Sequence, residues 1–264
     1  LNSINTNLPH DFVIAPYNNI EGTRNALSFL PQSTLAAILV EGIQGSGGCV
    51  VGDPKFLKFL ETTAHQLGAL FIMDEVMTSR LTHHGLSASL GLKPDLVTLG
   101  KWVGGGMTFG AFGGRKDIMD RFDPSKGQLF HPGTYNNNVL SMSAGLVGLD
   151  IYNAAEVERL NKLGEDVKKQ VQQILIDEGI YPSTFTDGLG DIVEIDSFEQ
   201  DTSLEIDGTL RAQEKLPPMF ITGRGSMLNV RFSVPNSADW QGLYYHHMLS
   251  KNIYVAVRGY TPLH

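Results

Sequence analysis

The sequence lacks features that would indicate several classes of protein. It has a single cysteine, Cys49, so no internal disulfide can form, and a reducing, cytoplasmic location is the natural expectation. Acidic residues outnumber basic ones by 28 to 20, and the net charge of −8 leaves no basic face for nucleic acid. No apolar run reaches the roughly 18 residues that a membrane span requires. We therefore expect a protein that binds neither nucleic acid nor membrane.

Sequence patterns for metal and nucleotide binding are also missing. The only adjacent histidines are His83-His84 and His246-His247, and neighbouring side chains point apart on helices and strands, so we expect no metal site. The glycine-rich stretches that begin at Gly42 and Gly104 fit neither G-x-G-x-x-G nor a P-loop. His83-His84 either lies at the mouth of an active site or belongs to an ordinary surface loop.

Two apolar runs each lead into a charged residue. The run Leu70–Met73 predicts a buried strand that stops at Asp74, and Leu96–Leu99 predicts a second strand that ends just before Lys101. Ligands of parallel α/β sheets bind at the carboxyl ends of the strands. We therefore expect Asp74 and Lys101 to lie at one crevice.

A lysine and a carboxylate at one crevice suit the chemistry of pyridoxal 5'-phosphate (PLP). A lysine amine forms a Schiff base with the cofactor aldehyde, and a substrate amine displaces it. A carboxylate beside the ring nitrogen keeps that nitrogen protonated, so that the ring withdraws electrons from the substrate Cα. The freed Lys101 amine can then carry the Cα proton. Taken singly, each residue favours an ordinary role, Asp74 as the start of a loop and Lys101 as an exposed lysine. Taken together they favour a ligand site, because the glycines after Lys101 let the backbone approach a ligand closely.

The motifs around these residues resemble those of the fold-type I, class III PLP-dependent aminotransferases, and particularly the branch that includes glutamate-1-semialdehyde aminomutase. The motifs are Asp-Glu-Val-Met-Thr from Asp74, Pro-Asp-Leu from Pro94, Leu-Gly-Lys to Lys101, Gly-Gly-Gly-Met from Gly104 and Gly-Ala-Phe-Gly-Gly-Arg from Gly110. The resemblance covers nearly the whole chain and is weakest at residues 196–220.

The resemblance implies roles for four residues. Lys101 would form the Schiff base, and Asp74 would pair with the pyridinium nitrogen. Val76 would pack on one face of the ring, since strand alternation places Asp74 and Val76 on the same side, although a core valine is the alternative. Thr134 matches the threonine that contacts the cofactor phosphate of the neighbouring subunit, whereas local sequence alone favours a helix N-cap. The family thus implies a homodimer whose sites are shared across the interface.

The expected fold is α/β, the fold-type I architecture of PLP-dependent transferases. Residues 1–152 would form part of a large domain with a mostly parallel sheet, and residues 153–264 part of a smaller C-terminal α+β domain. Both are expected to be incomplete, because the chain begins inside what resembles the middle of the large domain. Expected helices cover 54–67 (with Asp53 as N-cap), 116–122, 138–152, 156–178 and 239–250, and further strands cover 35–41, 109–112, 192–195, 227–232 and 253–257. The acidic stretch 199–218 is interpreted as a solvated loop, with a segment covering the site as the alternative.

The sequence therefore predicts a transaminase that moves an amino group between a small amine or amino acid and a carbonyl acceptor through Lys101. The alternatives are an aminomutase or racemase of the same family, and a non-catalytic truncated remnant that binds a partner. Met77 stands where many class III transaminases carry glutamine, which agrees with the aminomutase branch, but Thr261 stands where aminomutases carry glutamate. Candidates for binding a substrate carboxylate, or alternatively for structural ion pairs, are Arg80, Arg231 and Arg258.

Overall fold

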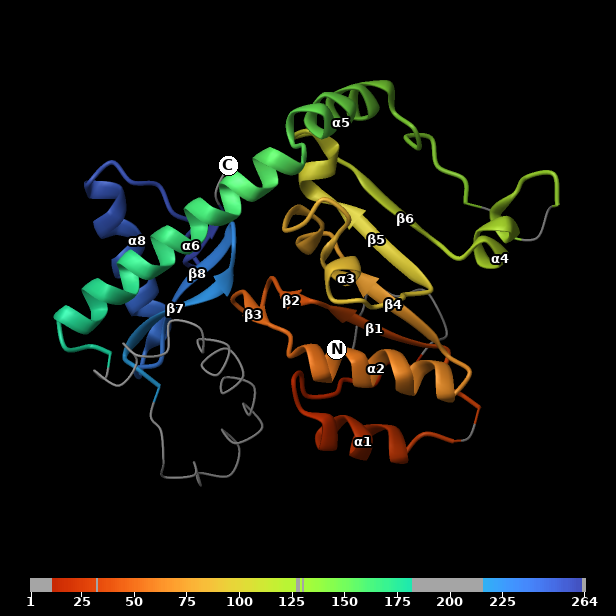
Figure 1. Ribbon diagram of the computed structural model, residues 1–264, viewed down its shortest axis with the longest axis horizontal. Helices are drawn as coiled ribbons and strands as arrows, with labels where there is room; N and C mark the ends of the chain where they lie inside the picture. Colours follow the sequence, from red (N-terminus) through yellow and green to blue (C-terminus); the bar gives the residue numbers. More distant parts are fainter. Residues whose placement is uncertain (1–10, 32, 127–128, 130, 182–215, 263–264) are drawn as a thin grey trace.

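The computed structural model describes residues 11–31, 33–126, 129, 131–181 and 216–262. A four-stranded sheet, in the order β1-β4-β5-β6, forms one half of the described structure, on the right in Figure 1. The strands β1, β4 and β5 are parallel, and β6 is antiparallel to β5, so the expectation of a mostly parallel sheet is confirmed. The strands are β1 (Ala37–Glu41), β4 (Leu70–Asp74), β5 (Leu96–Gly100) and β6 (Gly110–Gly114).

Helix α2 (Pro54–Gln66) covers one face of this sheet and buries an apolar stripe against it. Its first turn is capped as predicted, because Asp53 Oδ1 accepts a hydrogen bond from the N–H of Lys55 at 2.6 Å. Phe56 and Leu57 pack with Phe71 and Met73 of β4, and all four are at most 3% exposed. This core fixes the position of β4, and with it the position of Asp74 at the carboxyl edge of the sheet.

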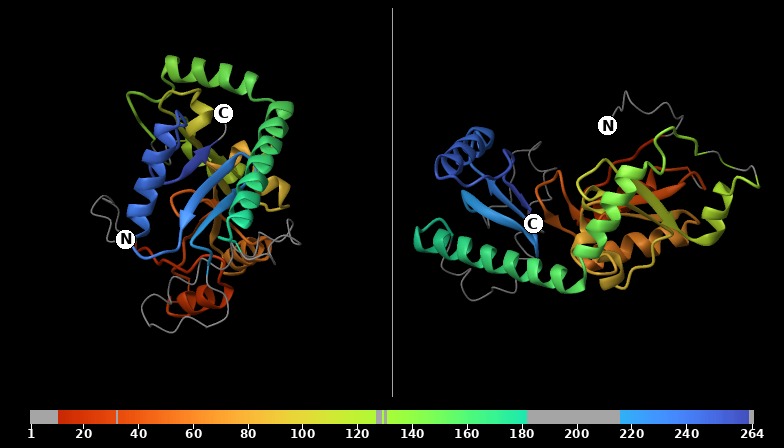
Figure 2. Two further views of the ribbon diagram at one scale, coloured as in Figure 1. Left: turned by 90° about the vertical axis from the view of Figure 1, so that its left-hand side faces the viewer. Right: turned by 90° about the horizontal axis from the view of Figure 1, so that it is seen from above.

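A second sheet is antiparallel and three-stranded, in the order β7-β8-β9. It consists of β7 (Met219–Arg224), β8 (Met227–Phe232) and β9 (Tyr260–Pro262). Helix α6 (Ala154–Asp177) runs from the first sheet across the second, as both views show (Figure 2), and helix α8 (Ser237–Ser250) lies against β8. Val167 and Val171 of α6 pack against Ile221 and Leu228 of the sheet.

A small apolar cluster joins the second sheet to the segments that follow β1 and β4. Ile43 of β2 (Ile43–Gln44) and the neighbouring Cys49 pack with Leu81, Leu86 and Met227. The Thr222 hydroxyl of β7 donates to the carbonyl of Gly48 at 2.5 Å, next to β3 (Val50–Val51). These contacts set the position of the second sheet over the carboxyl edge of the first.

The remaining elements are short helices and helical turns around the first sheet. The α-helices are α1 (Ile20–Ser28), α3 (Leu86–Ser89), α4 (Lys116–Met119) and α5 (Val139–Ile151). The 3-10 turns are η1 (Thr78–Arg80), η2 (Lys101–Gly104) and η3 (Asp120–Phe122). Among the described helices none is long and apolar enough to cross a bilayer. The expected domain boundary at residue 152 falls between α5 and α6 and stays a prediction.

One expectation about a strand is wrong, and one strand of the second sheet was missed. Residues 253–257 form no strand, because the chain turns at Gly259, whose N–H bonds to the Ala256 carbonyl at 2.8 Å, and pairs with β8 only from Tyr260. Strand β7 was not predicted, because its apolar residues follow the polar stretch that was interpreted as loop. The expected strand at 192–195 and most of the expected loop, residues 199–215, lie outside the described residues.

Asp95 connects the start of β5 to its neighbours through a buried carboxylate. It accepts hydrogen bonds from the N–H of Phe71 at 2.7 Å, from Arg115 Nη1 at 2.7 Å and from His65 Nε2 at 3.0 Å. Burial opposes ionisation, but these donors together hold the pKa of Asp95 below its usual range. The ionised carboxylate therefore stabilises the fold above the unfolded-state pKa of about 3.9, and this stabilisation is lost as the pH falls through the native pKa.

We expect Asp95→Asn to lower the free energy of unfolding by about 1–3 kcal/mol at neutral pH, because Arg115 loses a charged acceptor. The difference from the wild type should shrink at about pH 3, below the unfolded-state pKa of about 3.9, where part of the stabilisation by the ionised carboxylate is already lost. Urea unfolding at both pH values measures this. Asp120→Asn, which alters an exposed pair with Lys116, is the matched control and should have a smaller effect. If Asp95→Asn lowered the free energy of unfolding by the same amount at both pH values, the ionised Asp95 carboxylate would not be the source of the stabilisation.

Candidate active site

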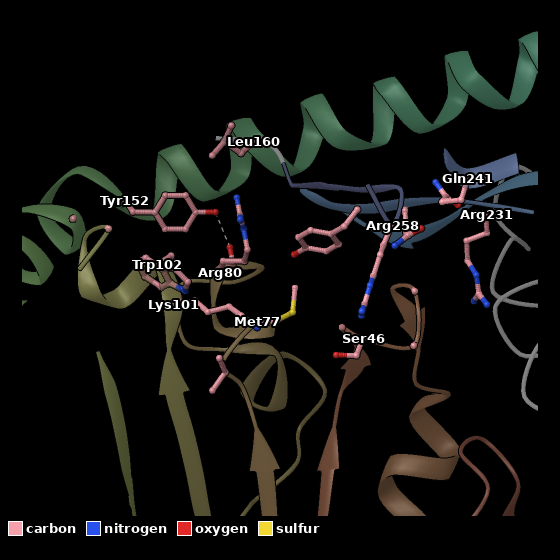
Figure 3. Close-up of a pocket in the computed structure, with 18 of the residues that line it drawn as sticks. Ser46, Met77, Arg80, Lys101, Trp102, Tyr152, Leu160, Arg231, Gln241 and Arg258 are labelled. Carbon is pink, nitrogen blue, oxygen red and sulfur yellow. Dashed lines mark hydrogen bonds between the residues drawn. The ribbon is translucent and has the colours of Figure 1, made fainter. Parts of the chain in front are cut away.

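A cleft of about 1080 Å³ lies between the carboxyl edge of the first sheet, the second sheet, and the junction of α5 and α6 (Figure 3). The first sheet contributes the residues after β4 and β5, including Val76, Met77 and Lys101. The glycine-rich turn Gly45–Gly48 lines another wall. Arg231 of β8 and Arg258 before β9 face it from the second sheet. The sequence prediction that the strand ends lie at a crevice is thus correct for Lys101.

Lys101 follows β5 directly and has an unusual backbone conformation. Its φ of +52° lies in the left-handed region, which disfavours any residue with a Cβ. Such a conformation costs about 1–3 kcal/mol and persists only where the surrounding structure holds it. The side chain is exposed to the cleft, and its Nζ has no hydrogen bond or ion pair with any described residue. The amine is therefore available to a ligand.

Helix α5 holds the Lys101 turn by direct backbone contact. A Cβ added to Gly105 would meet the Ala144 carbonyl oxygen at 2.0 Å, and one added to Gly145 would meet the Val103 oxygen at 2.5 Å. Gly105 also has a φ of +59° and ends η2. The glycines after Lys101 therefore let α5 and η2 approach more closely than side chains would allow.

Asp74 ends β4, and its register partners Glu41 and Thr98 lie on the neighbouring strands β1 and β5. Its Oδ1 accepts from the Val76 N–H at 2.9 Å and from the Thr98 hydroxyl at 3.0 Å. Its Oδ2 makes no hydrogen bond with a described residue, so it can accept one from a ligand. Asp74 is half-buried and is not among the residues that line the cleft wall.

Val76 lines the cleft, but the alternation argument that paired it with Asp74 is wrong. Strand β4 stops at Asp74, and Val76 lies in the following turn. The bond from its N–H to Asp74 Oδ1, rather than strand alternation, brings the two residues together. Glu75, between them, faces the other way: it is 1% exposed and accepts from the N–H groups of Leu86 and Ser87 at the start of α3.

Thr134 is exposed in the turn before α5 and does not line the cleft. It is not the N-cap that local sequence favours. That position belongs to Asn138, whose Oδ1 accepts from the N–H groups of Leu140 and Ser141 at 3.0 and 3.3 Å. The predicted contact of Thr134 with a phosphate of another subunit stays a prediction.

All three candidate arginines line the cleft, but they differ in exposure and in their contacts. Arg80 is buried, and its Nε donates to the Ser226 hydroxyl at 3.2 Å. Arg231 lies 5.7 Å from the centre of the Phe220 ring. Arg258 is exposed and forms no hydrogen bond or ion pair with a described residue. With Lys101, these arginines outnumber Glu156, the acidic side chain in the described lining, and the excess of positive charge favours an anionic ligand.

His83 and His84 do not line the cleft. Both are exposed, and their rings meet edge to face at 4.8 Å, because they lie in a turn where adjacent side chains need not point apart. Sequence reasoning missed Trp102 and Tyr152, whose rings pack at 4.7 Å beside Lys101. An aromatic residue directly after the predicted lysine was the available signal. Among the described residues, no three His, Cys, Asp or Glu side chains are placed to hold a metal ion.

The donor set fits PLP. Lys101 offers an amine without a partner, Asp74 offers a free carboxylate oxygen, and Val76 offers an apolar side chain in the cleft wall. The cationic wall suits the phosphate and an anionic substrate. The arrangement is that of a PLP-dependent transferase of fold type I, with a mostly parallel sheet whose carboxyl edge carries the lysine and the aspartate.

The chain belongs to the class III aminotransferase family, whose members use PLP: the family model "Aminotransferase class-III" matches residues 9–215. A β-phenylalanine transaminase from Variovorax paradoxus is 38% identical over 259 residues, which is 98% of this chain and 53% of that protein. The crystal structure of a β-phenylalanine aminotransferase from the same organism matches with a TM-score of 0.78 at 35% identity, covering 97% of this chain and 53% of the other.

A glutamate-1-semialdehyde 2,1-aminomutase from Clostridium kluyveri is 39% identical over 171 residues, which is 64% of this chain and 40% of that protein. These findings confirm the resemblance drawn from the motifs around Asp74 and Lys101. The chain spans about half the length of the β-phenylalanine transaminase that it matches.

We expect Gly105→Ala to destabilise the protein by about 1–3 kcal/mol more than Gly106→Ala. Both glycines have positive φ, so both substitutions strain the backbone, but only the Gly105 methyl meets another backbone, since nothing lies within 4 Å of a Cβ at Gly106. Thermal unfolding of the two variants isolates the contact between η2 and α5. Equal destabilisation would show that α5 does not hold the Lys101 turn.

Proposed function

We propose that this chain performs PLP-dependent transamination, with Lys101 as the residue that bonds to the cofactor and Asp74 as the partner of its ring nitrogen. The observation that carries the proposal is the Lys101 amine, which lies in the cleft without a partner, one strand away from the free Oδ2 of Asp74. The similarity to a β-phenylalanine transaminase supports the same reaction class.

Each residue has a distinct task in this proposal. When bound, PLP supplies an electron-withdrawing ring that makes the substrate Cα–H acidic. The Lys101 Nζ takes the proton from that carbon as a general base and returns it as a general acid. Asp74 Oδ2 accepts a hydrogen bond from the protonated ring nitrogen and stabilises its charge. Val76 packs against the ring and excludes water from one side.

The cationic wall supports a substrate that carries an anionic group. Arg258 is the candidate for a carboxylate, because its guanidinium is exposed to the cleft without a partner among the described residues and can bind two oxygens at once. An amino acid that gives its amine to a carbonyl acceptor fits this arrangement. Aminomutase activity is the second candidate, supported by Met77 in the cleft wall and by the aminomutase relative.

Borohydride reduction in the presence of PLP should attach a pyridoxyl group to Lys101, located by peptide mass mapping, because reduction traps the C=N bond between Nζ and the aldehyde carbon. Lys101→Ala should abolish both the attachment and keto-acid-dependent amine transfer. Lys116→Ala, which removes an exposed lysine outside the cleft, should leave both unchanged. Specific binding of a partner without any attachment at Lys101 would favour the non-catalytic remnant.

We propose further that two copies associate through α5 and the preceding turn, with the site shared between them. Val139, Leu140, Leu146, Val147 and Ile151 of α5 are each more than half exposed, an apolar surface of a kind that usually marks an interface. Thr134 lies exposed beside it and outside its own cleft, which supports a contact with the phosphate in another copy. For the location, we propose the cytoplasm, because the chain has a single cysteine and cannot form an internal disulfide.

We expect Thr134→Val to weaken PLP affinity about tenfold, since it keeps the shape but removes a hydroxyl that would bond to a charged phosphate. Dimerisation should change less. Sedimentation followed at protein and cofactor absorbance measures both, and Thr34→Val, a matched change at an exposed threonine, should alter neither. A monomer that keeps full cofactor occupancy, or unchanged affinity in Thr134→Val, would contradict the shared site.

A further inference from the structure

Trp102, the residue after Lys101, makes two contacts that connect the turn after β5, directly and through Tyr152, to the turn after β4. Its indole Nε1–H donates to the Ser79 hydroxyl at 2.9 Å, and its ring packs on Tyr152 with the ring centres 4.7 Å apart. The Tyr152 hydroxyl in turn donates to the Arg80 carbonyl at 2.9 Å (Figure 3). We call these four residues, Ser79, Arg80, Trp102 and Tyr152, the Trp102 cluster.

The cluster lies where it can control the direction of the Lys101 side chain. Ser79 and Arg80 belong to η1, which follows Asp74 and Val76 on the chain, whereas Trp102 belongs to η2 with Lys101. Ser79 and Arg80 are buried, and the Arg80 Nε donates to Ser226 beside β8, so η1 is a fixed support. The Trp102 indole therefore connects η2, the turn that carries Lys101, to η1, the turn that follows Asp74.

The backbone of Lys101 needs such a support. Its left-handed φ of +52° is disfavoured at a lysine, whereas the left-handed conformation at Gly105, where the turn ends, is one that glycine adopts readily. The close backbone approaches that Gly145 and Gly148 of α5 allow involve Val103 and Gly105, with the Trp102 carbonyl farther away. Trp102 is the first side chain after Lys101 and has the hydrogen bond that fixes the lysine end of the turn.

We propose that Trp102, held by Ser79 and Tyr152, is a positioning residue that keeps the Lys101 amine directed into the cleft, where it meets the cofactor aldehyde. The inference deepens the proposed function and rests on it, since it concerns the same amine. The Lys101 Nζ attacks the aldehyde carbon, water leaves, and a C=N bond forms; the cluster sets the geometry of this attack. It touches neither reacting atom.

The test measures the rate at which Lys101 bonds to the cofactor, rather than turnover. The wild-type chain and the variants Ser79→Ala and Trp102→Phe are mixed with saturating PLP, quenched with borohydride at timed intervals, and analysed by peptide mass. Ser79→Ala removes the acceptor and Trp102→Phe removes the donor while keeping a ring on Tyr152. Each should slow attachment at least about tenfold, as expected for a misdirected group. The double variant should be no slower than the singles, because they break the same bond.

Ser89→Ala is the matched control: it removes a hydroxyl that donates to the Leu86 carbonyl in α3, and attachment should keep the wild-type rate.

A second readout uses fluorescence. The chain has two tryptophans, so Trp240→Phe leaves Trp102 as the only source of tryptophan emission, and attachment of PLP to the neighbouring Lys101 should quench it. Circular dichroism at the assay temperature shows whether each variant is folded. If Trp102→Phe is unfolded, the attachment rate of Ser79→Ala alone tests the inference.

The outcomes separate the two claims. A wild-type chain that attaches PLP at Lys101, with Ser79→Ala and Trp102→Phe attaching it equally fast, would overturn the positioning role and leave the proposed function intact. A wild-type chain that attaches no PLP at Lys101 would overturn the proposed function and this inference with it. Slower attachment in folded variants, with Ser89→Ala unaffected, supports the inference, since a purely structural role would change stability without changing the rate at saturating cofactor.

Discussion

The site depends on the register of three parallel strands. Glu41 pairs with Asp74 and Asp74 with Thr98, so β1, β4 and β5 end at the same edge, and the next residues of each chain segment must turn there. Lys101 follows β5 within three residues of Thr98 and is therefore one strand away from Asp74. A shift of register by one residue would turn the Asp74 side chain to the other face of the sheet and disconnect it from the lysine.

A second constraint acts on the turn after β5. Lys101 has a backbone conformation that its own side chain disfavours, so neighbouring structure must hold it. Gly105 and Gly145 allow backbone contact between η2 and α5, and Trp102 joins η2 to η1. The free energy that the left-handed lysine costs is thus offset by packing and hydrogen bonds several residues away, which is typical of positions where geometry matters for chemistry.

The cleft also requires both sheets. Its cationic wall combines Lys101 and Arg80, in the turns that follow β5 and β4, with Arg231 of β8 and Arg258 before β9. The apolar cluster of Ile43, Cys49 and Met227 keeps the two sheets together. On the opposite side, α5 exposes apolar side chains that no described residue covers, although its inner face supports the lysine turn. The same helix therefore links the proposed interface to the proposed catalytic residue.

Local patterns determined much of this arrangement in advance. The runs before Asp74 and Lys101 predicted both strands, Asp53 predicted the start of α2, and the shared motifs predicted the family, because apolar runs, caps and motifs are contiguous in sequence. Local sequence failed where partners are distant. It assigned the N-cap of α5 to Thr134 rather than Asn138, placed a strand at 253–257, and missed β7, whose strand character comes from pairing with β8.

The sequence by itself determined which groups could perform the chemistry: an amine at Lys101, a carboxylate at Asp74, and glycines that allow close approach. Only the tertiary structure decided how they are used. It showed that the Asp74 carboxylate turns back to the Val76 N–H, that the Lys101 backbone is left-handed, and that Trp102 bonds to Ser79. Each of these depends on contacts between segments that meet only after folding, and no local preference of the chain encodes them.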